Sequence, residues 1–252
     1  MGASEITLLE ADLDIPRARA FTTLRPGGVS VGPYRGLNLA DHVGDQSEPV
    51  AANRSALARL LPPELRITWL QQVHGTEVVS ANRVAAGTPP QADAVWSDRP
   101  GAGCAVLTAD CLPIVLAAAD GSQVAAIHAG WRGLAAGVIE ATLAAMPQTS
   151  ADMLAWFGPA IGPCCYDVGA EVREAFVTAQ GDDADRYFVP GHPKGKFHAD
   201  LYGLAALRLH RAGIKSITGG DQCTACDAHN YFSHRRDGQT GRMATLVTLL
   251  PS

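Results

Sequence analysis

The spacing of short apolar runs constrains the fold of this 252-residue chain more than any other sequence feature. Several of these runs follow one another with no helical pattern between them, so their strands are expected to pair as neighbours. Four longer segments have helical periodicity and end at proline or glycine. This order predicts an α+β fold, or a mixed-sheet α/β fold, and not a doubly wound dinucleotide-binding sheet. The predicted strands are 67–73, 77–81, 104–108, 113–118, 124–128, 153–158 and 242–250, and the predicted helices are 47–61, 131–146, 168–180 and 200–212.

The composition is that of one globular domain, which we place at residues 1–252. Hydrophobic residues make up 47% of the chain and charged residues 18%, and no repeat or linker divides it. The formal net charge of -5 argues against nucleic-acid and membrane partners, which usually require a basic face. The apolar runs are too short to span a membrane, and the N-terminus lacks a signal-peptide pattern. We therefore expect a cytoplasmic protein whose six cysteines are thiols or ligands and not disulfides.

Three short segments carry the densest chemistry, whereas the motifs of P-loop enzymes, serine hydrolases and zincins are absent. His74, Cys111 and His128 each lie at the end of an apolar run, beside glycine, aspartate or a helix start. Two imidazoles and one thiolate suit zinc or another borderline-soft metal, and three protein ligands leave a fourth position open. The alternative is two unrelated histidines and one buried cysteine, because the spacings match no local zinc motif.

Four further cysteines form two close pairs, Cys164-Cys165 and Cys223-Thr-Ala-Cys226. A structural zinc needs four ligands, and adjacent cysteines rarely bind one tetrahedral ion. The second pair leads into a polar segment and lacks the strand–helix context of a thioredoxin-like motif. We therefore expect loop cysteines, with a redox or secondary metal role as the alternative.

Arginines near the predicted turns are candidates for holding an anionic substrate. A planar guanidinium binds phosphate or carboxylate through two parallel hydrogen bonds, and the alternative is a structural ion pair. The candidates are Arg25, Arg132, Arg235 and Arg236.

Two aspartates and one histidine complete the set of candidates. Asp110 adjoins Cys111 and is expected to transfer a proton or to orient a neighbour. Asp93 has the same two alternatives, with an Asx turn as its plainest explanation. His42 is either a further ligand or a loop residue.

These segments resemble the YfiH/YlmD family over residues from about 21 to 247. The resemblance is carried by long motifs: Gln72-Val-His-Gly75, Thr108-Ala-Asp-Cys-Leu-Pro113, His128-Ala-Gly-Trp-Arg-Gly133, Gly158-Pro-Ala-Ile-Gly-Pro-Cys-Cys-Tyr166 and Phe232-Ser-His-Arg-Arg-Asp-Gly-Gln-Thr-Gly-Arg242. The family was once labelled multicopper polyphenol oxidase or laccase, and its members are now regarded as zinc-dependent purine nucleoside phosphorylases.

The resemblance implies a layered α/β/β/α fold and a zinc ion held by His74, Cys111 and His128. It also implies phosphorolysis of adenosine, inosine, guanosine and methylthioadenosine, together with deamination of adenosine. We expect Asp110 to act with the three ligands in catalysis. The expected substrate-binding residues are Arg25, His42, Arg132 and Arg235.

The chain departs from the family pattern at a few positions. Leu24 interrupts the usual Thr-Thr-Arg run, which puts the role of Arg25 in question. Ala205 stands where asparagine is usual, and His234 replaces the usual aromatic residue before Arg235.

Two other activities fit the same residues. A copper-dependent, laccase-like oxidase is one, although laccases hold several coppers with many histidines and this chain has no His-x-His pair. The other is an amidase that edits a peptidoglycan precursor, with Cys111 as nucleophile. The expected partners are small purine nucleosides and phosphate, and the protein is expected to be a monomer or homodimer.

Overall fold

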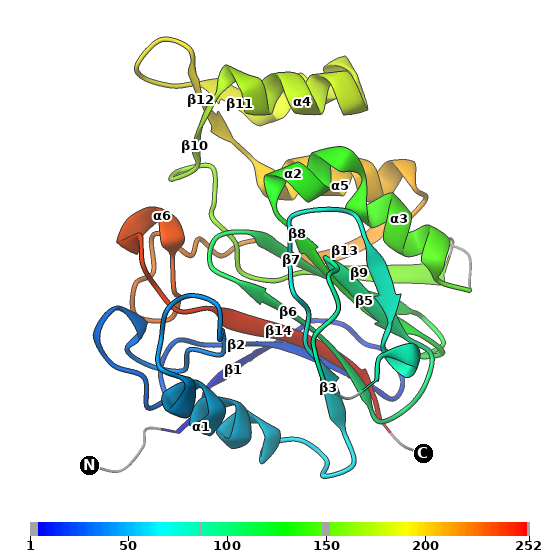
Figure 1. The fold of residues 1–252 in the computed structure, drawn as a ribbon. Coiled ribbons are helices and arrows are strands. Elements are labelled where there is room, and N and C mark those ends of the chain that lie inside the picture. The colour runs from blue at the N-terminus through cyan, green and yellow to red at the C-terminus, as the bar shows by residue number, and fades with distance from the viewer. Residues whose placement is uncertain (1–4, 86, 148–151, 251–252) are drawn as a thin grey trace.

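Two β-sheets pack face to face, and helices cover both outer faces, as Figure 1 shows. The computed structural model describes residues 5–85, 87–147 and 152–250. The five-stranded sheet has the order β1-β2-β14-β6-β3, and the six-stranded sheet has the order β13-β9-β7-β8-β5-β4. Both sheets mix parallel and antiparallel pairs. The expected α+β class and the layered α/β/β/α arrangement are confirmed.

The first sheet is built from β1 (Leu8–Glu10), β2 (Ala18–Thr23), β14 (Met243–Leu249), β6 (Ala102–Thr108) and β3 (Arg66–Thr68). The second is built from β13 (Ser216–Gly219), β9 (Met153–Phe157), β7 (Leu112–Ala118), β8 (Val124–Ala129), β5 (Ala94–Ser97) and β4 (Val78–Ser80). A small third sheet joins β10 (Asp167–Gly169), β12 (Lys196–Ala199) and β11 (Phe188–Pro190).

The helices lie on the two outer faces of this sandwich. Helix α1 (Ser47–Ala58) covers the first sheet, where its Leu57 packs with Phe21 and Leu246. Helices α2 (Trp131–Ala136), α3 (Val138–Ala145) and α5 (Leu201–Arg211) cover the second sheet, with α4 (Ala170–Gln180) beyond them and the short α6 (His234–Asp237) at the edge (Figure 1). Among the described residues, short 3-10 helices span Gly32–Tyr34, Ala81–Arg83 and Asp182–Tyr187.

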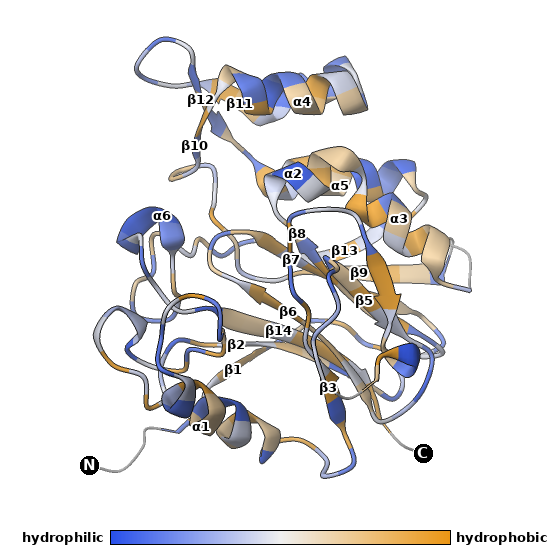
Figure 2. Cartoon of the chain, viewed as in Figure 1, coloured by the Kyte–Doolittle hydropathy of each residue, from blue (hydrophilic) through white to orange (hydrophobic). Residues whose placement is uncertain are grey.

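The central strands are apolar along most of their length because both of their faces are covered. Every residue of β7, β8 and β14 is buried, and Figure 2 shows hydrophobic residues concentrated along the central strands. Between the sheets, Val106, Val115 and Val247 belong to one buried cluster. This core holds the ends of the central strands in fixed positions, and the candidate site lies at those ends.

Several predicted boundaries are wrong for local reasons. The predicted helix 131–146 is divided into α2 and α3 at Gly137, whose φ of +100° is in the left-handed region. The predicted strand 67–73 ends at Thr68, and the following loop carries His74 toward the site. Helix α1 ends at Ala58, before the predicted limit at 61, and residues 168–169 belong to β10 and not to α4. None of the helices in the described ranges is long and apolar enough to cross a membrane.

Candidate active site

Three chain segments bring His74, Cys111 and His128 together at one edge of the second sheet. Cys111 lies in the turn between β6 and β7, and His128 lies near the end of β8. Strands β7 and β8 pair so that Pro113 lies opposite His128, which places the turn beside that histidine. His74 comes from the loop after β3. The strand pairing therefore explains why residues far apart in sequence share this site.

The three side chains are arranged to hold one metal ion. Their potential ligand atoms all lie within 4.8 Å of one another, and Cys111 Sγ is 3.8 Å from His74 Nε2. The two imidazole rings are 4.7 Å apart and nearly perpendicular, with an interplanar angle of 77°. A tetrahedral zinc ion with ordinary bond lengths would separate sulfur from nitrogen by about 3.6 Å. The donor set and its spacing thus fit zinc.

Asp93 orients two of these three residues. Its carboxylate is fully buried and accepts a hydrogen bond of 2.7 Å from His128 Nδ1, which directs Nε2 of that ring toward Cys111. The same carboxylate accepts bonds from the backbone N–H groups of Val73, His74 and Gly75. Such a concave group of N–H donors stabilises an anion, and here it holds His74 in the left-handed region at φ +60°. Asp93 is more than the simple turn residue that the sequence suggested, because it is a positioning residue for both histidines.

The space among the three candidate ligands depends on a glycine. A Cβ atom at Gly130 would lie 2.8 Å from His74 Cδ2, 3.2 Å from Cys111 Sγ and 3.5 Å from His128 Nε2. A side chain at this position would therefore clash with His74 and crowd Cys111, and it would touch His128. Gly130 directly precedes α2, so the helix begins at the metal-binding group without obstructing it.

The electrostatics of the group favour a thiolate. Burial raises the pKa of Cys111, but the imidazoles of His128 and His74 outweigh it and lower the pKa to about 6. Burial lowers the pKa of His128, but Cys111 and Asp93 outweigh this effect and raise it. Cys111 is therefore ready to act as a negatively charged ligand at neutral pH.

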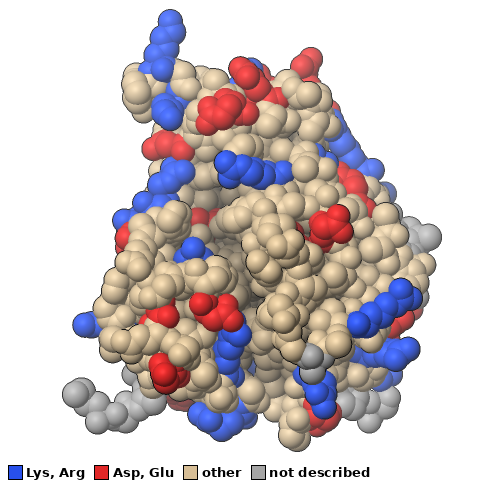
Figure 3. All heavy atoms as spheres, viewed as in Figure 1, with Lys and Arg blue, Asp and Glu red and all other residues tan. Residues whose placement is uncertain are grey.

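The three residues line a cavity of about 440 Å³, within the size range of small-molecule sites. Its walls combine aromatic and apolar residues, including Trp131, Tyr166, Ile161 and Leu201, with polar side chains. In the space-filling view, this face of the molecule is hollowed and basic side chains lie in and beside the hollow (Figure 3). Two larger hollows of about 790 and 770 Å³ lie elsewhere, and neither is lined by histidine or cysteine.

Two arginines line this cavity. Arg132 stacks on the Trp131 ring at 4.5 Å and makes no hydrogen bond or ion pair to any described residue. Arg242 donates from Nη1 to the carbonyls of Thr240 and Gly241, and burial lowers its pKa. The sequence suggested Arg132 but missed Arg242, which only its place at the end of a family motif could have indicated.

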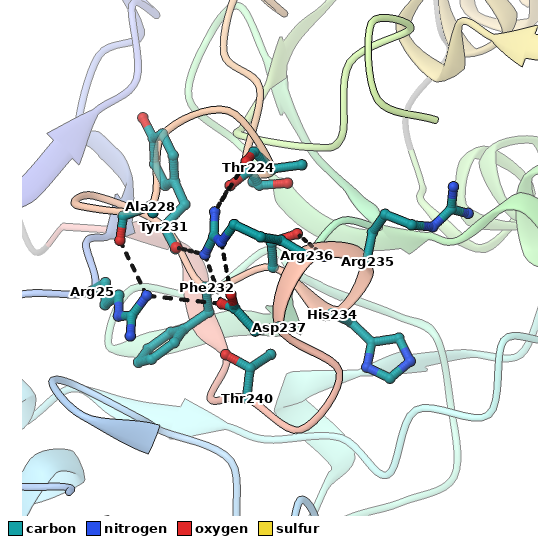
Figure 4. Close-up of polar contacts among 12 residues, drawn as sticks. Arg25, Thr224, Ala228, Tyr231, Phe232, His234, Arg235, Arg236, Asp237 and Thr240 are labelled. Atoms are coloured by element: carbon teal, nitrogen blue, oxygen red, sulfur yellow. Dashed lines mark hydrogen bonds and ion pairs between the residues drawn. The ribbon is translucent and has the colours of Figure 1, made fainter. Parts of the chain in front are cut away.

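Arg25, by contrast, lies outside the residues that line the cavity. Its guanidinium donates to the carbonyls of Ala228 and Arg35, and Nη1 is 3.8 Å from Asp237 (Figure 4). Nε and Nη1 are thus engaged within the protein, and the structure does not bring Arg25 together with the other candidate substrate-binding residues in the cavity lining.

Arg235 lies outside the residues that line the cavity, whereas His42 lies among them, as expected of a substrate-binding residue. Figure 4 shows Arg235 pointing away from the network formed by Arg25, Arg236 and Asp237, and its Nη1 donates to the carbonyl of Asp167. Arg235 also stacks on the ring of Tyr166, which lines the cavity. His42 lines the cavity as an exposed residue beside Asp41, but it lies outside the group of three potential ligands.

Asp110 has both carboxylate oxygens engaged by the protein. Oδ1 accepts a hydrogen bond from Thr224 Oγ1, and Oδ2 accepts one from the backbone N–H of Arg235, each at 2.6 Å. Asp110 itself has a left-handed φ of +89°. This geometry favours the orienting alternative for Asp110 over proton transfer.

Comparison with known proteins identifies the family to which the chain belongs. Residues 19–250 match the family model described as multi-copper polyphenol oxidoreductase laccase. A protein of Pseudomonas aeruginosa named purine nucleoside phosphorylase is 48% identical over 92% of this chain and 94% of its own length. Escherichia coli YfiH, also named purine nucleoside phosphorylase, is 44% identical over 92% of this chain and 93% of its own.

Solved structures show the same architecture. A Neisseria meningitidis protein, NMB0706, superposes with a TM-score of 0.92 at 45% identity and covers 97% of this chain and 99% of its own. YlmD from Geobacillus stearothermophilus superposes with a TM-score of 0.84 at 32% identity, covering 94% and 93%. The chain therefore belongs to the multi-copper polyphenol oxidoreductase laccase family, the family of YfiH and YlmD.

Proposed function

We propose that the protein is a zinc-dependent purine nucleoside phosphorylase that also deaminates adenosine. The observation that carries this proposal is a His-Cys-His group, suited to zinc, that opens into a cavity with both arginines and aromatic walls. The names of the curated relatives support the phosphorylase activity. The proposed substrates are adenosine, inosine, guanosine and methylthioadenosine, each with phosphate.

His74, Cys111 and His128 would hold the zinc, with Asp93 orienting the His128 ring and holding the backbone that carries His74. When bound, zinc would supply a Lewis acid that stabilises negative charge on a base or on water. Three protein ligands would leave a fourth position open, as in catalytic zinc sites.

Phosphorolysis places specific demands on the remaining residues. The bond from ribose to the purine breaks while phosphate attacks the same carbon, so positive charge develops on the sugar and the base leaves with negative charge. Arg132 and Arg242 are the cationic groups that line the cavity and would hold phosphate near the sugar. Trp131 and Tyr166 offer ring faces for the purine.

The donor set favours this activity over copper-dependent oxidation. Within the described ranges, two clusters of side chains have the spacing of metal ligands, and neither contains more than two histidines. Several coppers in a laccase would need many more imidazoles. Added copper could still occupy the His-Cys-His group, because it outcompetes zinc at such ligands.

The test of the function is base release from adenosine by zinc-loaded protein, with and without phosphate. We expect adenine and ribose 1-phosphate only when phosphate is present, and inosine from the deaminase reaction in either case. Absence of nucleoside turnover in protein with a full zinc content would reject the proposal. Hydrolysis of an amide-linked serine by the same sample would then favour the amidase alternative.

Replacing Arg132 by alanine should weaken phosphate binding. A hydrogen bond to a charged group contributes roughly 1.5–3 kcal/mol, so we expect KM for phosphate to rise about 10-fold to 100-fold. Initial rates of adenine release at varied phosphate concentration measure this change. Arg59→Ala is the matched control, because Arg59 is exposed at the end of α1 and should leave KM unchanged. An unchanged KM in the Arg132 variant would remove this residue from the phosphate site.

A further inference from the structure

Four cysteines from two distant segments meet beside the candidate active site. Cys164 and Cys165 lie in the turn before β10, and Cys223 and Cys226 lie in the loop after β13. All four Sγ atoms are within 4.8 Å of one another. All four lie in loops, as expected, and the folded chain joins two pairs that the sequence separates by about 60 residues, which favours the metal-binding alternative. None of the four lines the cavity of about 440 Å³.

The sulfur positions match a tetrahedral metal site more closely than a pair of disulfides. Sγ of Cys164 is 3.6 Å from that of Cys223 and 3.5 Å from that of Cys226, and Cys165 Sγ is 3.4 Å from Cys226 Sγ. A zinc ion bound by four sulfurs at ordinary bond lengths would separate them by about 3.8 Å. A disulfide requires roughly 2.05 Å. One sulfur, that of Cys226, approaches both members of the adjacent pair.

The backbone around the cluster is arranged to receive thiolates. The N–H of Gly162 donates to Cys223 Sγ at 3.3 Å, an interaction that stabilises a negatively charged sulfur. A Cβ at Gly162 would lie 3.3 Å from Cys223 Cβ, so a side chain there would crowd the loop that carries Cys223. The Cys165 N–H donates to the Gly162 carbonyl and closes a turn after Gly162. This turn directs two consecutive cysteines into the same cluster.

The cluster also has access to solvent. Cys164 and Cys226 are exposed, whereas cysteines without a ligand or bond usually act as small buried hydrophobic residues. Cys104, which is buried in β6, is an example of that ordinary kind in the same chain. Four thiols clustered at the surface are therefore expected to bind a metal ion, and four sulfurs at tetrahedral spacing are typical of a zinc site.

We propose that Cys164, Cys165, Cys223 and Cys226 bind a second zinc ion, which has a structural role. Four protein ligands close its coordination sphere, in contrast to the open three-ligand group. The zinc ties the loop of residues 162–167 to that of residues 223–227. It belongs to a site different from the one in the proposed function and does not depend on that function.

The second zinc would stabilise two parts of the cavity wall. Thr224, between the two cysteines of its loop, donates to Asp110, the neighbour of Cys111, and its carbonyl accepts a bond from Arg236 (Figure 4). Tyr166 follows Cys165 directly and lines the cavity. Loss of the ion should therefore loosen both residues without removing any ligand of the first metal site.

Metal content of the full-length protein, purified with a non-thiol reductant, tests this assignment. Native mass spectrometry and elemental analysis should show two zinc ions per chain in the wild type. Cys226→Ser and Cys111→Ser should each retain one, and the double variant should retain none. Cobalt-loaded Cys111→Ser should show the absorption of a four-thiolate site, and cobalt-loaded Cys226→Ser should not. Cys104→Ala is the control that should keep both ions.

A second measurement applies to the wild type alone and so does not depend on how the variants fold. Peptide mapping after alkylation should find the four cysteines protected, and a chelator should make them reactive. The proposal is overturned if the wild type holds one zinc ion that Cys226→Ser keeps, or if the four thiols react freely in the native protein. A mass lower by two or four hydrogens, which indicates disulfides, or iron in place of zinc would also overturn it.

Discussion

Replacing Cys111 by alanine is expected to remove one zinc equivalent and to reduce nucleoside phosphorolysis by about 10³-fold. The thiolate is the only negatively charged member of the three-residue group, and its low pKa of about 6 makes it available at neutral pH. Two imidazoles alone would bind the ion weakly. Loss of the metal removes several kcal/mol of charge stabilisation from the transition state. A loss of this size lowers the rate by about three orders of magnitude.

The measurement combines zinc content with the rate of adenine release from adenosine in saturating phosphate. Cys104→Ala is the matched control, because Cys104 is fully buried in β6, where burial raises its pKa well above the ordinary value. That variant should keep its zinc and its rate, with at most a small loss of stability. A Cys111→Ala protein with the wild-type zinc content and rate would show that the His-Cys-His group is not the active site.

The fold was largely predictable because buried strands appear in the sequence as short apolar runs. Strands β6, β7, β8, β9 and β14 are apolar along most of their length, and their predicted limits agree within two residues. The short edge strands β1 and β13 were missed because they are only partly buried and carry no continuous apolar run, and the interior strand β2 was missed as well. Pairing between strands depends on contacts that no local pattern specifies.

The sequence predicted the reactive residues of the site but not the residues that position them. His74, Cys111 and His128 are conspicuous because each stands beside glycine or aspartate at the end of an apolar run. Asp93 was undervalued because its three backbone donors come from a loop about 20 residues earlier in the chain, and its histidine partner comes 35 residues later. The cysteine cluster was missed for the same reason, since two separate loops assemble it. Local spacing identifies reactive groups, whereas long-range folding decides which of them meet.

Replacing Asp93 by asparagine is expected to weaken zinc binding by 10-fold to 100-fold, as for other outer partners of metal-binding histidines. The carboxylate accepts from His128 Nδ1 and from the backbone N–H groups of His74 and Gly75, so one side chain orients the His128 ring and holds the backbone that carries His74. Asparagine keeps the volume but loses the charge. Its amide would also place an N–H donor opposite protein groups that are themselves hydrogen-bond donors.

The same substitution should destabilise the metal-free protein by roughly 1.5–3 kcal/mol, since it removes hydrogen bonds to a buried charged group. Relaxing the left-handed backbone at His74 would add to the effect on the site. Zinc affinity is measured by competition with a chelator, and stability by urea unfolding of the metal-free protein. The two readouts are needed together because a merely structural carboxylate would change the second without the first.

Asp200→Asn is the matched control for Asp93→Asn. Asp200 caps α5 by accepting from the Gly203 N–H, a role that asparagine fills equally well, so both readouts should remain at wild-type values. If Asp93→Asn lowered stability but bound zinc with wild-type affinity, the carboxylate would only support the loop that carries His74. Weaker zinc binding that persists where the variant is fully folded would instead establish that the orientation of the two imidazoles, set by this carboxylate, determines metal affinity.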